Sequence, residues 1–289
     1  MIVVTGSSGF IGSNLVRKFY DMGKEVACVD YLDMKYDLEF YKNNGFKTIC
    51  EFSAHDFYSS LESYKKRFNI ELIFHEGAIS STTETDQTKL DQYNIQCTIR
   101  LIEFCEKHKI SLQYASSASV YGNPTKETWD LVDKPLKPLN LYAKSKTKID
   151  FFAKNIIRKL PDKPIQGMRY FNVYGPNEEH KEDQASPYHK FNKQFKETGK
   201  IKLFEGSREF YRDFISVEEL IEKKLYCIEN KESGIYDVGT GNPKSFYDVA
   251  IEICGSEEHI EWIPIPDNLK EHYQKYTKAN MDWLSKISG

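Results

Sequence analysis

The stretch Thr5-Gly6-Ser7-Ser8-Gly9-Phe10-Ile11-Gly12 follows the first apolar run of the chain, Ile2–Thr5, and opens a segment of helical period. Its three glycines allow a sharp backbone turn and a close ligand approach, because no Cβ stands in the way. A helix that starts after such a turn offers unpaired N–H groups to an anion. This position, after a strand and before a helix, predicts a dinucleotide pyrophosphate site, with an ordinary glycine-rich turn as the alternative.

Short apolar runs alternate with segments of helical period through the first half of the chain. This alternation implies βαβ crossovers, and therefore a parallel sheet with helices on both faces. We predict an α/β fold with a Rossmann-type doubly wound parallel sheet. The expected helices are Ile11–Asp21, Tyr58–Phe68, Leu90–His108 and Tyr142–Lys159, and the expected strands are Ile2–Thr5, Val26–Asp30, Lys47–Phe52, Leu72–His75, Leu112–Ser116 and Ile165–Phe171.

The pattern becomes irregular from about Gly175 onward, where short strands mix with helices and a loop rich in proline. We therefore predict a dinucleotide-binding domain over residues 1–174. Residues 175–289 should form mainly a smaller C-terminal α/β substrate lobe, with some elements returning to the first domain. The elements expected in this part are the strands Ile201–Phe204, Asp213–Val217 and Ile235–Val238, the helices Val217–Ile228 and Phe246–Cys254, and the loop Ile263–Leu269.

Composition excludes several classes of partner. The chain has 289 residues, and 40 basic against 43 acidic side chains give a formal charge of −3, which favours neither nucleic acid nor an anionic membrane. Six cysteines without a CxxC pair indicate free thiols in a reducing compartment, and we expect no metal site. The chain opens directly on an apolar strand, and no apolar run is long enough to span a bilayer. We expect a cytoplasmic protein.

Asp30 ends the second expected strand, where a carboxylate commonly accepts a hydrogen bond from the adenosine ribose of a dinucleotide. This charge favours NAD, because it would repel a 2′-phosphate. Lys35 in the following loop could offset it. A plain turn residue at the strand end is the alternative for Asp30.

A second constellation combines the end of the fifth strand with the start of the next helix. Ser116 and Ser117 end the strand, and Tyr142 and Lys146 stand four residues apart, so that on a helix they project from one face. A free tyrosine titrates near 10, and a neighbouring ammonium favours the phenolate. Tyr142 could then act as an acid/base at neutral pH, with the Ser117 hydroxyl bonded to the reacting oxygen. An exposed helix face is the alternative for the Tyr-x-x-x-Lys string.

In order and spacing, the glycine turn, the strand-end serines and the Tyr-x-x-x-Lys string resemble the extended short-chain dehydrogenases/reductases. Further strings narrow the resemblance to the ADP-glyceromanno-heptose 6-epimerases. Those strings are Phe74–Glu84, Arg169–Pro176, His180-Lys181 with Ala185-Ser186, Leu203–Ser207 with Arg212-Asp213-Phe214, and Tyr273.

The resemblance implies that the chain converts ADP-D-glycero-manno-heptose into its L-glycero epimer by transient oxidation at C6″. It also implies NADP as a tightly bound cofactor, with NAD left open by Asp30, and we expect a homo-oligomer. The implied catalytic residues are Ser117, Tyr142, Lys146 and, as a second acid/base, Lys181. The implied cofactor-binding residues are Gly6, Gly9, Phe10, Ile11, Gly12, Asp30, Glu76, Gly77, Ala78, Ile79, Ser80, Asn94, Tyr142, Lys146, Val173 and Lys181. The implied substrate-binding residues are Ser117, Asn172, Ser186, Phe204, Glu205, Gly206, Ser207, Arg212 and Tyr273.

Three of these residues have structural alternatives. Arg212 could bind a diphosphate or form a surface salt bridge. Asn172 could bridge to substrate or cap a turn. Lys181 lies in the charged run 178–183, which could be a solvated loop.

Two other functions compete with the heptose epimerase. Another nucleotide-sugar epimerase or dehydratase, such as a UDP-sugar 4-epimerase, would use the same scaffold. Ala118 and Ser119 stand where a dehydratase usually carries an acid pair, which argues against dehydration. A non-catalytic dinucleotide-sensing protein is the remote alternative, and the intact set of Ser117, Tyr142 and Lys146 argues against it.

Overall fold

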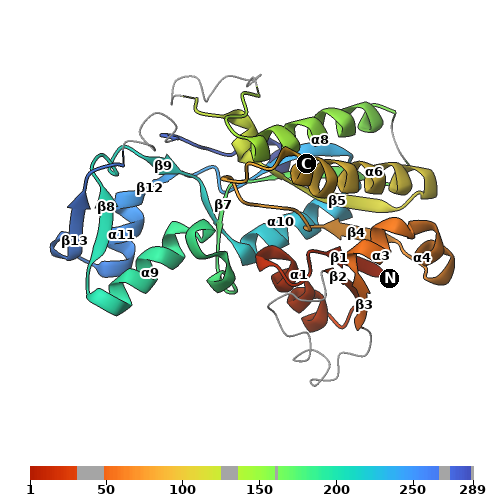
Figure 1. Cartoon of the computed structure of the whole chain (residues 1–289), viewed down its shortest axis with the longest axis horizontal. Helices are drawn as coiled ribbons and strands as arrows, with labels where there is room; N and C mark the ends of the chain where they lie inside the picture. The colour runs from red at the N-terminus through yellow and green to blue at the C-terminus, as the bar shows by residue number, and fades with distance from the viewer. Residues whose placement is uncertain (31–48, 125–135, 160–161, 267–273, 288–289) are drawn as a thin grey trace. The chain divides into compact units, whose positions relative to one another are not determined.

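The computed structural model describes residues 1–30, 49–124, 136–159, 162–266 and 274–287 (Figure 1). Its main sheet has seven strands in the order β11-β6-β5-β4-β1-β2-β3. The strands are β1 (Ile2–Thr5), β2 (Val26–Asp30), β3 (Ile49–Ser53), β4 (Leu72–His75), β5 (Ser111–Ser117), β6 (Ile165–Tyr170) and β11 (Gly234–Val238).

The strand order identifies the fold class. β1 pairs in parallel with both β2 and β4, and the sheet continues in parallel to β3 on one side and β5 on the other. An order of 3-2-1-4-5-6 is that of a doubly wound sheet, with its crossover between the first and fourth strands. The predicted fold class is therefore confirmed.

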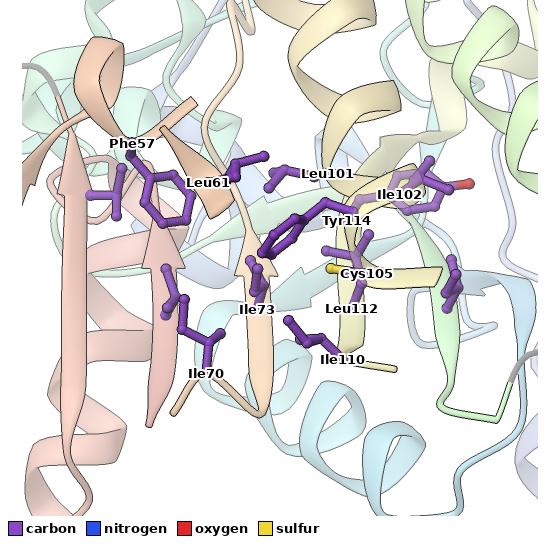
Figure 2. Close-up of a cluster of buried hydrophobic side chains, with 14 of the residues drawn as sticks. Phe57, Leu61, Ile70, Ile73, Leu101, Ile102, Cys105, Ile110, Leu112 and Tyr114 are labelled. Atoms are coloured by element: carbon purple, nitrogen blue, oxygen red, sulfur yellow. The ribbon is translucent and has the colours of Figure 1, made fainter. Parts of the chain in front are cut away.

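Alternate residues of the strands face two helical layers. Val3, Ile73 and Leu112 belong to a buried cluster with side chains of α3 (Ala54–Ser59), α4 (Leu61–Arg67), α6 (Cys97–His108) and α8 (Leu141–Ile157), part of which Figure 2 shows. On the other face, the ring centroid of Phe74 lies 5.4 Å from that of Phe19 on α1 (Phe10–Asp21). Helix α10 (Val217–Glu229) joins α1 on this face, where the Lys224 Nζ lies 5.3 Å from the Phe74 ring centroid.

The chain forms two compact units that interleave along the sequence. The first comprises residues 1–116, 140–169 and 221–236, and the second comprises 117–139, 170–220 and 237–289. The division into a dinucleotide-binding domain over 1–174 and a substrate lobe over 175–289 stays a prediction. Each unit has buried hydrophobic clusters of its own.

The second unit contains three two-stranded sheets. β7 (Asn172–Tyr174) pairs with β10 (Phe214–Ser216), β9 (Tyr211–Arg212) with β12 (Lys244–Ser245), and β8 (Ile201–Phe204) with β13 (Ile260–Ile263). One buried cluster joins β8 to α9 (Pro187–Thr198) and α11 (Phe246–Cys254) through side chains that include Phe191, Leu203 and Val249. Helix α13 (Asp282–Ile287) follows near the end of the chain.

Two long helices predicted from periodicity are wrong in detail. The segment Tyr58–Phe68 is two helices, α3 and α4, because Ser60 leaves the helical region with φ −129°. The segment Leu90–His108 begins as a π-helix, η1 (Leu90–Gln96), after the short helix α5 (Gln87–Lys89), and only then continues as α6. Apolar spacing alone does not distinguish a π turn from an α turn.

The strand predicted over Asp213–Val217 is shorter than expected. β10 ends at Ser216, because Val217 begins α10. Asp213 precedes β10, and its buried carboxylate accepts hydrogen bonds from backbone N–H groups of Thr240, Gly241 and Ala279. Asp213 therefore organises a loop junction. The other predicted helices and strands match observed ones within a few residues where they are described, as Phe246–Cys254 does without change. The predicted strand Lys47–Phe52 and the predicted loop Ile263–Leu269 lie partly outside the described residues, and Ile263 itself ends β13.

Within the described ranges, no helix is long and apolar enough to cross a membrane. The same ranges hold no group of three or more His, Cys, Asp or Glu side chains arranged for a metal ion. The cysteines described there, Cys28, Cys97, Cys105, Cys227 and Cys254, are free thiols.

Candidate active site

The glycine turn connects β1 to α1 in a conformation that side chains would prevent. Gly6 has a φ of +65°, and a Cβ added to it would lie 2.6 Å from the backbone nitrogen of Gly77. A Cβ at Gly12 would lie 2.0 Å from the carbonyl oxygen of Gly6. Gly9 is the N-cap of α1, and its N–H donates to the Gly6 carbonyl at 3.0 Å. The turn is thus a close-packed cradle that places Phe10 and Ile11 in the first turn of α1.

Asp30 is tied to this turn. Its Oδ2 accepts a hydrogen bond from the backbone N–H of Ser8 at 2.7 Å. The carboxylate therefore places a negative charge against the glycine turn, at the end of β2. Lys35, which could offset that charge, lies outside the described residues.

The segment that follows β4, Glu76–Ser80, is held on both sides. Its Glu76 and Gly77 N–H groups donate to the carbonyl and the hydroxyl of Thr5, at 3.1 and 3.2 Å. Further along, the Asn94 side chain accepts from the Ile79 N–H at 2.8 Å and donates to the Ile79 carbonyl at 3.0 Å. Hydrogen bonds at both ends therefore hold the predicted cofactor-binding segment beside the glycine turn, and we call Glu76–Ser80 the strip.

Asn94 reaches this strip from the π-helix η1. A π turn adds one residue to a helical turn and redirects the side chains around it. Asn94 is fully buried, and its amide also donates to the Ser145 hydroxyl on α8 at 3.2 Å. One side chain thus connects the strip after β4 to the helix that carries Tyr142.

His75, which sequence reasoning missed, lies buried under the same strip. Its Nε2 lies 2.9 Å from the Thr98 hydroxyl, which donates its own hydrogen to the Asn94 carbonyl at 2.6 Å. Nε2 must therefore carry the ring proton, and Nδ1 accepts from the Thr5 hydroxyl at 2.7 Å. Burial and, to a smaller extent, the Lys146 charge lower the pKa of His75 to about 3. The ring is neutral and joins β1, β4 and α6.

Tyr142 and Lys146 occupy one buried face of α8, as their spacing predicted. The helix is capped by Asn140, whose Oδ1 accepts from the Ala143 N–H at 2.8 Å. Lys146 Nζ donates to the carbonyl oxygen of Ala115 on β5 at 2.8 Å and lies 5.8 Å from the Tyr142 ring centroid. Both side chains are nearly inaccessible to solvent, which excludes the exposed-face alternative. Burial lowers the pKa of Lys146 to about 8, against the opposing charges of Glu76 and Asp150.

Ser117 ends β5, two residues after the carbonyl that Lys146 contacts. Its hydroxyl accepts from the Ser119 N–H at 3.2 Å and caps the short 3-10 turn η2 (Ala118–Tyr121). That turn is anchored within the second unit, where the Tyr121 hydroxyl donates to Asp237 at 2.6 Å. The strand end therefore holds the Ser117 backbone in a defined place.

In the second unit, Asn172 and Val173 lie on β7, and Lys181 lies in the 3-10 segment η3 (Glu179–Gln184) that follows. Burial lowers the pKa of Lys181, as does Lys190, while Glu178 opposes them. Lys181 is only partly accessible, so the segment is not a fully solvated loop. The Asn172 N–H donates to the Asp213 carbonyl at 3.0 Å, as part of the β7–β10 pairing.

Glu178, a residue without a predicted role, organises the segment around Lys181. It is buried, and its carboxylate accepts from the Gly175 N–H at 2.9 Å and from the Ser186 N–H at 2.6 Å. It also accepts from the Ser186 hydroxyl at 2.8 Å. Ser186 in turn caps α9 by accepting from the His189 N–H. The Ser186 hydroxyl is therefore engaged in holding the loop.

The segment Phe204–Ser207 forms a tight turn after β8. Gly206 has a φ of +87°, and the Ser207 N–H donates to the Phe204 carbonyl at 3.0 Å. Nearby, Arg212 is buried and donates to the carbonyls of Tyr211 and Gln274, so it is not a surface side chain. Tyr273 lies outside the described residues.

The predicted site residues are divided between the two units. The first unit gathers the glycine turn, Asp30, the strip 76–80, Asn94, Tyr142 and Lys146. The second unit carries Ser117, Asn172, Val173, Lys181, Ser186, the turn 204–207 and Arg212. Each set consists of segments distant in sequence.

Comparison with known proteins identifies the family of the chain. Residues 2–239 match the NAD dependent epimerase/dehydratase family. The chain is 39% identical over 292 residues to an ADP-L-glycero-D-manno-heptose-6-epimerase of Brachyspira hyodysenteriae (strain ATCC 49526 / WA1), covering 98% of this chain and 90% of that protein.

Two solved structures are similar over the whole chain. The Helicobacter pylori ADP-L-glycero-D-manno-heptose-6-epimerase is 30% identical with a TM-score of 0.74, covering 100% of this chain and 96% of that one. A UDP-N-acetylglucosamine 4-epimerase from Methanobrevibacter ruminantium M1 has a TM-score of 0.83 at 23% identity, covering 100% and 91%, and shows the fold alone. The chain is an enzyme that belongs to the NAD dependent epimerase/dehydratase family.

Proposed function

We propose that this enzyme epimerises a nucleotide sugar and that its substrate is ADP-D-glycero-manno-heptose. The main support for this reaction is one observation. In a buried site beside the glycine turn, the Lys146 ammonium donates to the Ala115 carbonyl and lies 5.8 Å from the centroid of the Tyr142 ring. The substrate is supported by the 39% identity to the Brachyspira heptose epimerase over 98% of the chain.

The residues around the turn fit a nicotinamide dinucleotide. Gly6 and Gly12 pack against the backbone of Gly77 and of Gly6, where a Cβ would collide, and this gives the tight turn that a pyrophosphate cradle requires. The turn, Asp30, the backbone of 76–80 and Lys146 would hold the cofactor, which when bound accepts a hydride from the sugar and returns it. The resemblance implies NADP, whereas the carboxylate that Asp30 holds against Ser8 favours NAD. Denaturing the protein and identifying the released dinucleotide decides between them.

Tyr142 is the proposed acid/base on one wall of the site. As a phenolate it takes the proton of the C6″ hydroxyl while that carbon is oxidised, and the Lys146 ammonium favours the phenolate electrostatically. The Ser117 hydroxyl would donate a hydrogen bond to the same substrate oxygen. Inversion then needs the ketone to turn about its C5″–C6″ bond, because the hydride returns from the face it left.

Lys181 is the proposed second acid/base. After the ketone has turned, its oxygen points away from Tyr142, so a proton must come from another group. Burial lowers the pKa of Lys181, which makes its ammonium a better proton donor than an exposed lysine. The Glu178 carboxylate keeps the segment around it in place.

The remaining predicted residues would bind the nucleotide sugar. The exposed Gly206, the Asn172 side chain and the Arg212 guanidinium would supply donors for phosphates and hydroxyls. The Glu205 N–H already donates to the Ile263 carbonyl at 2.9 Å, so Glu205 would contribute through its side chain. Ser186 would act through the loop it shares with Glu178.

The test is turnover by the purified protein on a panel of ADP-, UDP-, GDP- and dTDP-sugars, with epimers observed by NMR. Epimerisation of ADP-D-glycero-manno-heptose at C6″, with no net consumption of the nicotinamide cofactor, is the expected result. Faster epimerisation of a UDP-sugar at C4″ would replace the proposed substrate, and formation of an unsaturated or deoxy sugar would replace the reaction.

We also propose that the enzyme is a homo-oligomer. Phe151 on α8, a large apolar residue that is 58% exposed, is a side chain that such an assembly would cover. Light scattering on the purified protein measures the assembly, and a monomeric mass at micromolar concentration would contradict it.

A further inference from the structure

The first unit buries an ion pair that the proposed reaction does not use. Lys224 on α10 and Glu76 after β4 approach to 2.7 Å between Nζ and Oε1, and their side chains are 0% and 3% exposed. Removing one partner of such a pair leaves the other charge buried without a counter-charge, which is strongly destabilising. α10 is itself fixed here, because the Lys224 carbonyl accepts from the Gln113 side chain at 2.8 Å.

A second buried pair lies on the helix of the catalytic residues. The Asp150 carboxylate bonds Arg169 Nε at 2.8 Å and accepts from the Tyr114 hydroxyl at 3.1 Å. Glu76 and Asp150 are the two carboxylates whose charges act on Lys146. Each of them already has a cation of its own, and within the described residues Lys146 donates to a carbonyl rather than to either carboxylate.

We propose that Lys224 is a positioning residue for Lys146: by holding the Glu76 carboxylate, it leaves the Lys146 ammonium on the Ala115 carbonyl beside Tyr142. The proposal rests on the proposed function, in which Tyr142 transfers a proton with the help of Lys146.

The consequence for Tyr142 follows from the charges. The titratable groups that interact electrostatically with Lys146 or lie beside it are Glu76, His75, Asp150 and Tyr142. Asp91 on η1 forms its ion pair with Lys148. The buried set of both ion pairs and Lys146 carries one net positive charge. Without Lys224 the net charge of this set becomes zero, and the Glu76 carboxylate attracts the Lys146 ammonium in place of Lys224. The phenolate form of Tyr142 is then stabilised less by positive charge.

The experiment compares three variants. Lys224→Met removes the cation, Lys224→Gln removes the charge but keeps a hydrogen-bond donor, and the double variant Glu76→Gln/Lys224→Met restores the net charge. The titration of Tyr142 is read from ultraviolet phenolate absorbance of cofactor-free protein, as the difference between each background and the same background carrying Tyr142→Phe. The pH profile of kcat is the second readout.

Both single variants should move the Tyr142 midpoint and the acidic limb of the kcat profile to higher pH by about one unit, a tenfold loss of phenolate at a given pH. The double variant should return both to the wild-type position. Lys223→Met, which removes the same charge from the neighbouring residue of α10, should change neither and serves as the matched control.

A purely structural role has a different signature. If Lys224→Met and Lys224→Gln unfold at lower temperature but keep the wild-type Tyr142 midpoint, the proposal is wrong. It is also wrong if the double variant keeps the shifted midpoint. If the midpoint shifts as expected while no nucleotide sugar is epimerised, the positioning role stands and the proposed function fails.

Discussion

Acidification should destabilise the protein through His75. The ring is neutral in the folded protein, with Nε2 donating to Thr98 and Nδ1 accepting from Thr5. Burial lowers its pKa from 6.5 to about 3. In the unfolded chain the same ring binds a proton near pH 6.5, so the unfolded state holds more protons between those values. Stability therefore falls as the pH decreases from about 6.5 toward 3.

The size of the effect follows from linkage. A pH of about 5 is about 1.5 units below the pKa of the ring in the unfolded chain, whereas the folded ring is still neutral at this pH. At 1.36 kcal/mol per unit, this difference lowers the free energy of unfolding by about 2 kcal/mol. Urea unfolding followed by circular dichroism, at about pH 7.5 and about pH 5, measures the change. Other groups titrate in this interval, so the quantity to compare is the difference between wild type and a variant.

His75→Gln removes this one titration. The variant should be less stable than wild type at neutral pH, because it loses ring packing, but its stability should fall by about 2 kcal/mol less on acidification. His55→Gln is the matched control, since that side chain is 85% exposed and its loss should leave the wild-type dependence unchanged. Equal losses for wild type and His75→Gln would refute the reasoning, because the buried ring would then not be the group that titrates.

Three further predictions concern single side chains. Tyr142→Phe should lower kcat by about 10²–10⁴ and leave the released dinucleotide unchanged; activity within about threefold of wild type would remove Tyr142 from its role. Lys181→Met should lower epimerisation at least about a hundredfold with cofactor still bound, and normal NMR-detected turnover would leave Tyr142 to serve both faces. Asp213→Ala should cost at least about 3 kcal/mol in urea unfolding, because it strands the donors of Thr240, Gly241 and Ala279; a loss below about 1 kcal/mol contradicts this.

The elements that could be predicted from the sequence are those whose signal is local. β1, β2 and β4 are buried on both faces, so they read as continuous apolar runs, and Gly6 marks a turn that only glycine fits. The pairing of Tyr142 with Lys146 on one helix face follows from helical spacing alone. In these places a few neighbouring residues contain all the information that decides the structure.

The features that could not be predicted depend on partners distant in the chain. Glu76 meets a lysine 148 residues away, and nothing near either residue indicates the pair. Asn94 sits in a π turn whose apolar spacing matches an α-helix. The buried role of Glu178 was hidden because it opens a charged run, which reads as solvated until its backbone partners are known.

The interleaving of the first unit has a consequence for how the chain folds during synthesis. Its last segment, residues 221–236, supplies Lys224, which emerges from the ribosome long after Glu76. Until Lys224 is available, burial of the Glu76 carboxylate would leave its charge unpaired, so the strip after β4 must stay hydrated. Domains that fold as units usually do so in order of synthesis, but this one has to wait for about three quarters of the chain. A nascent chain stalled before α10 should therefore expose the strip 76–80 to proteases and to hydrogen exchange.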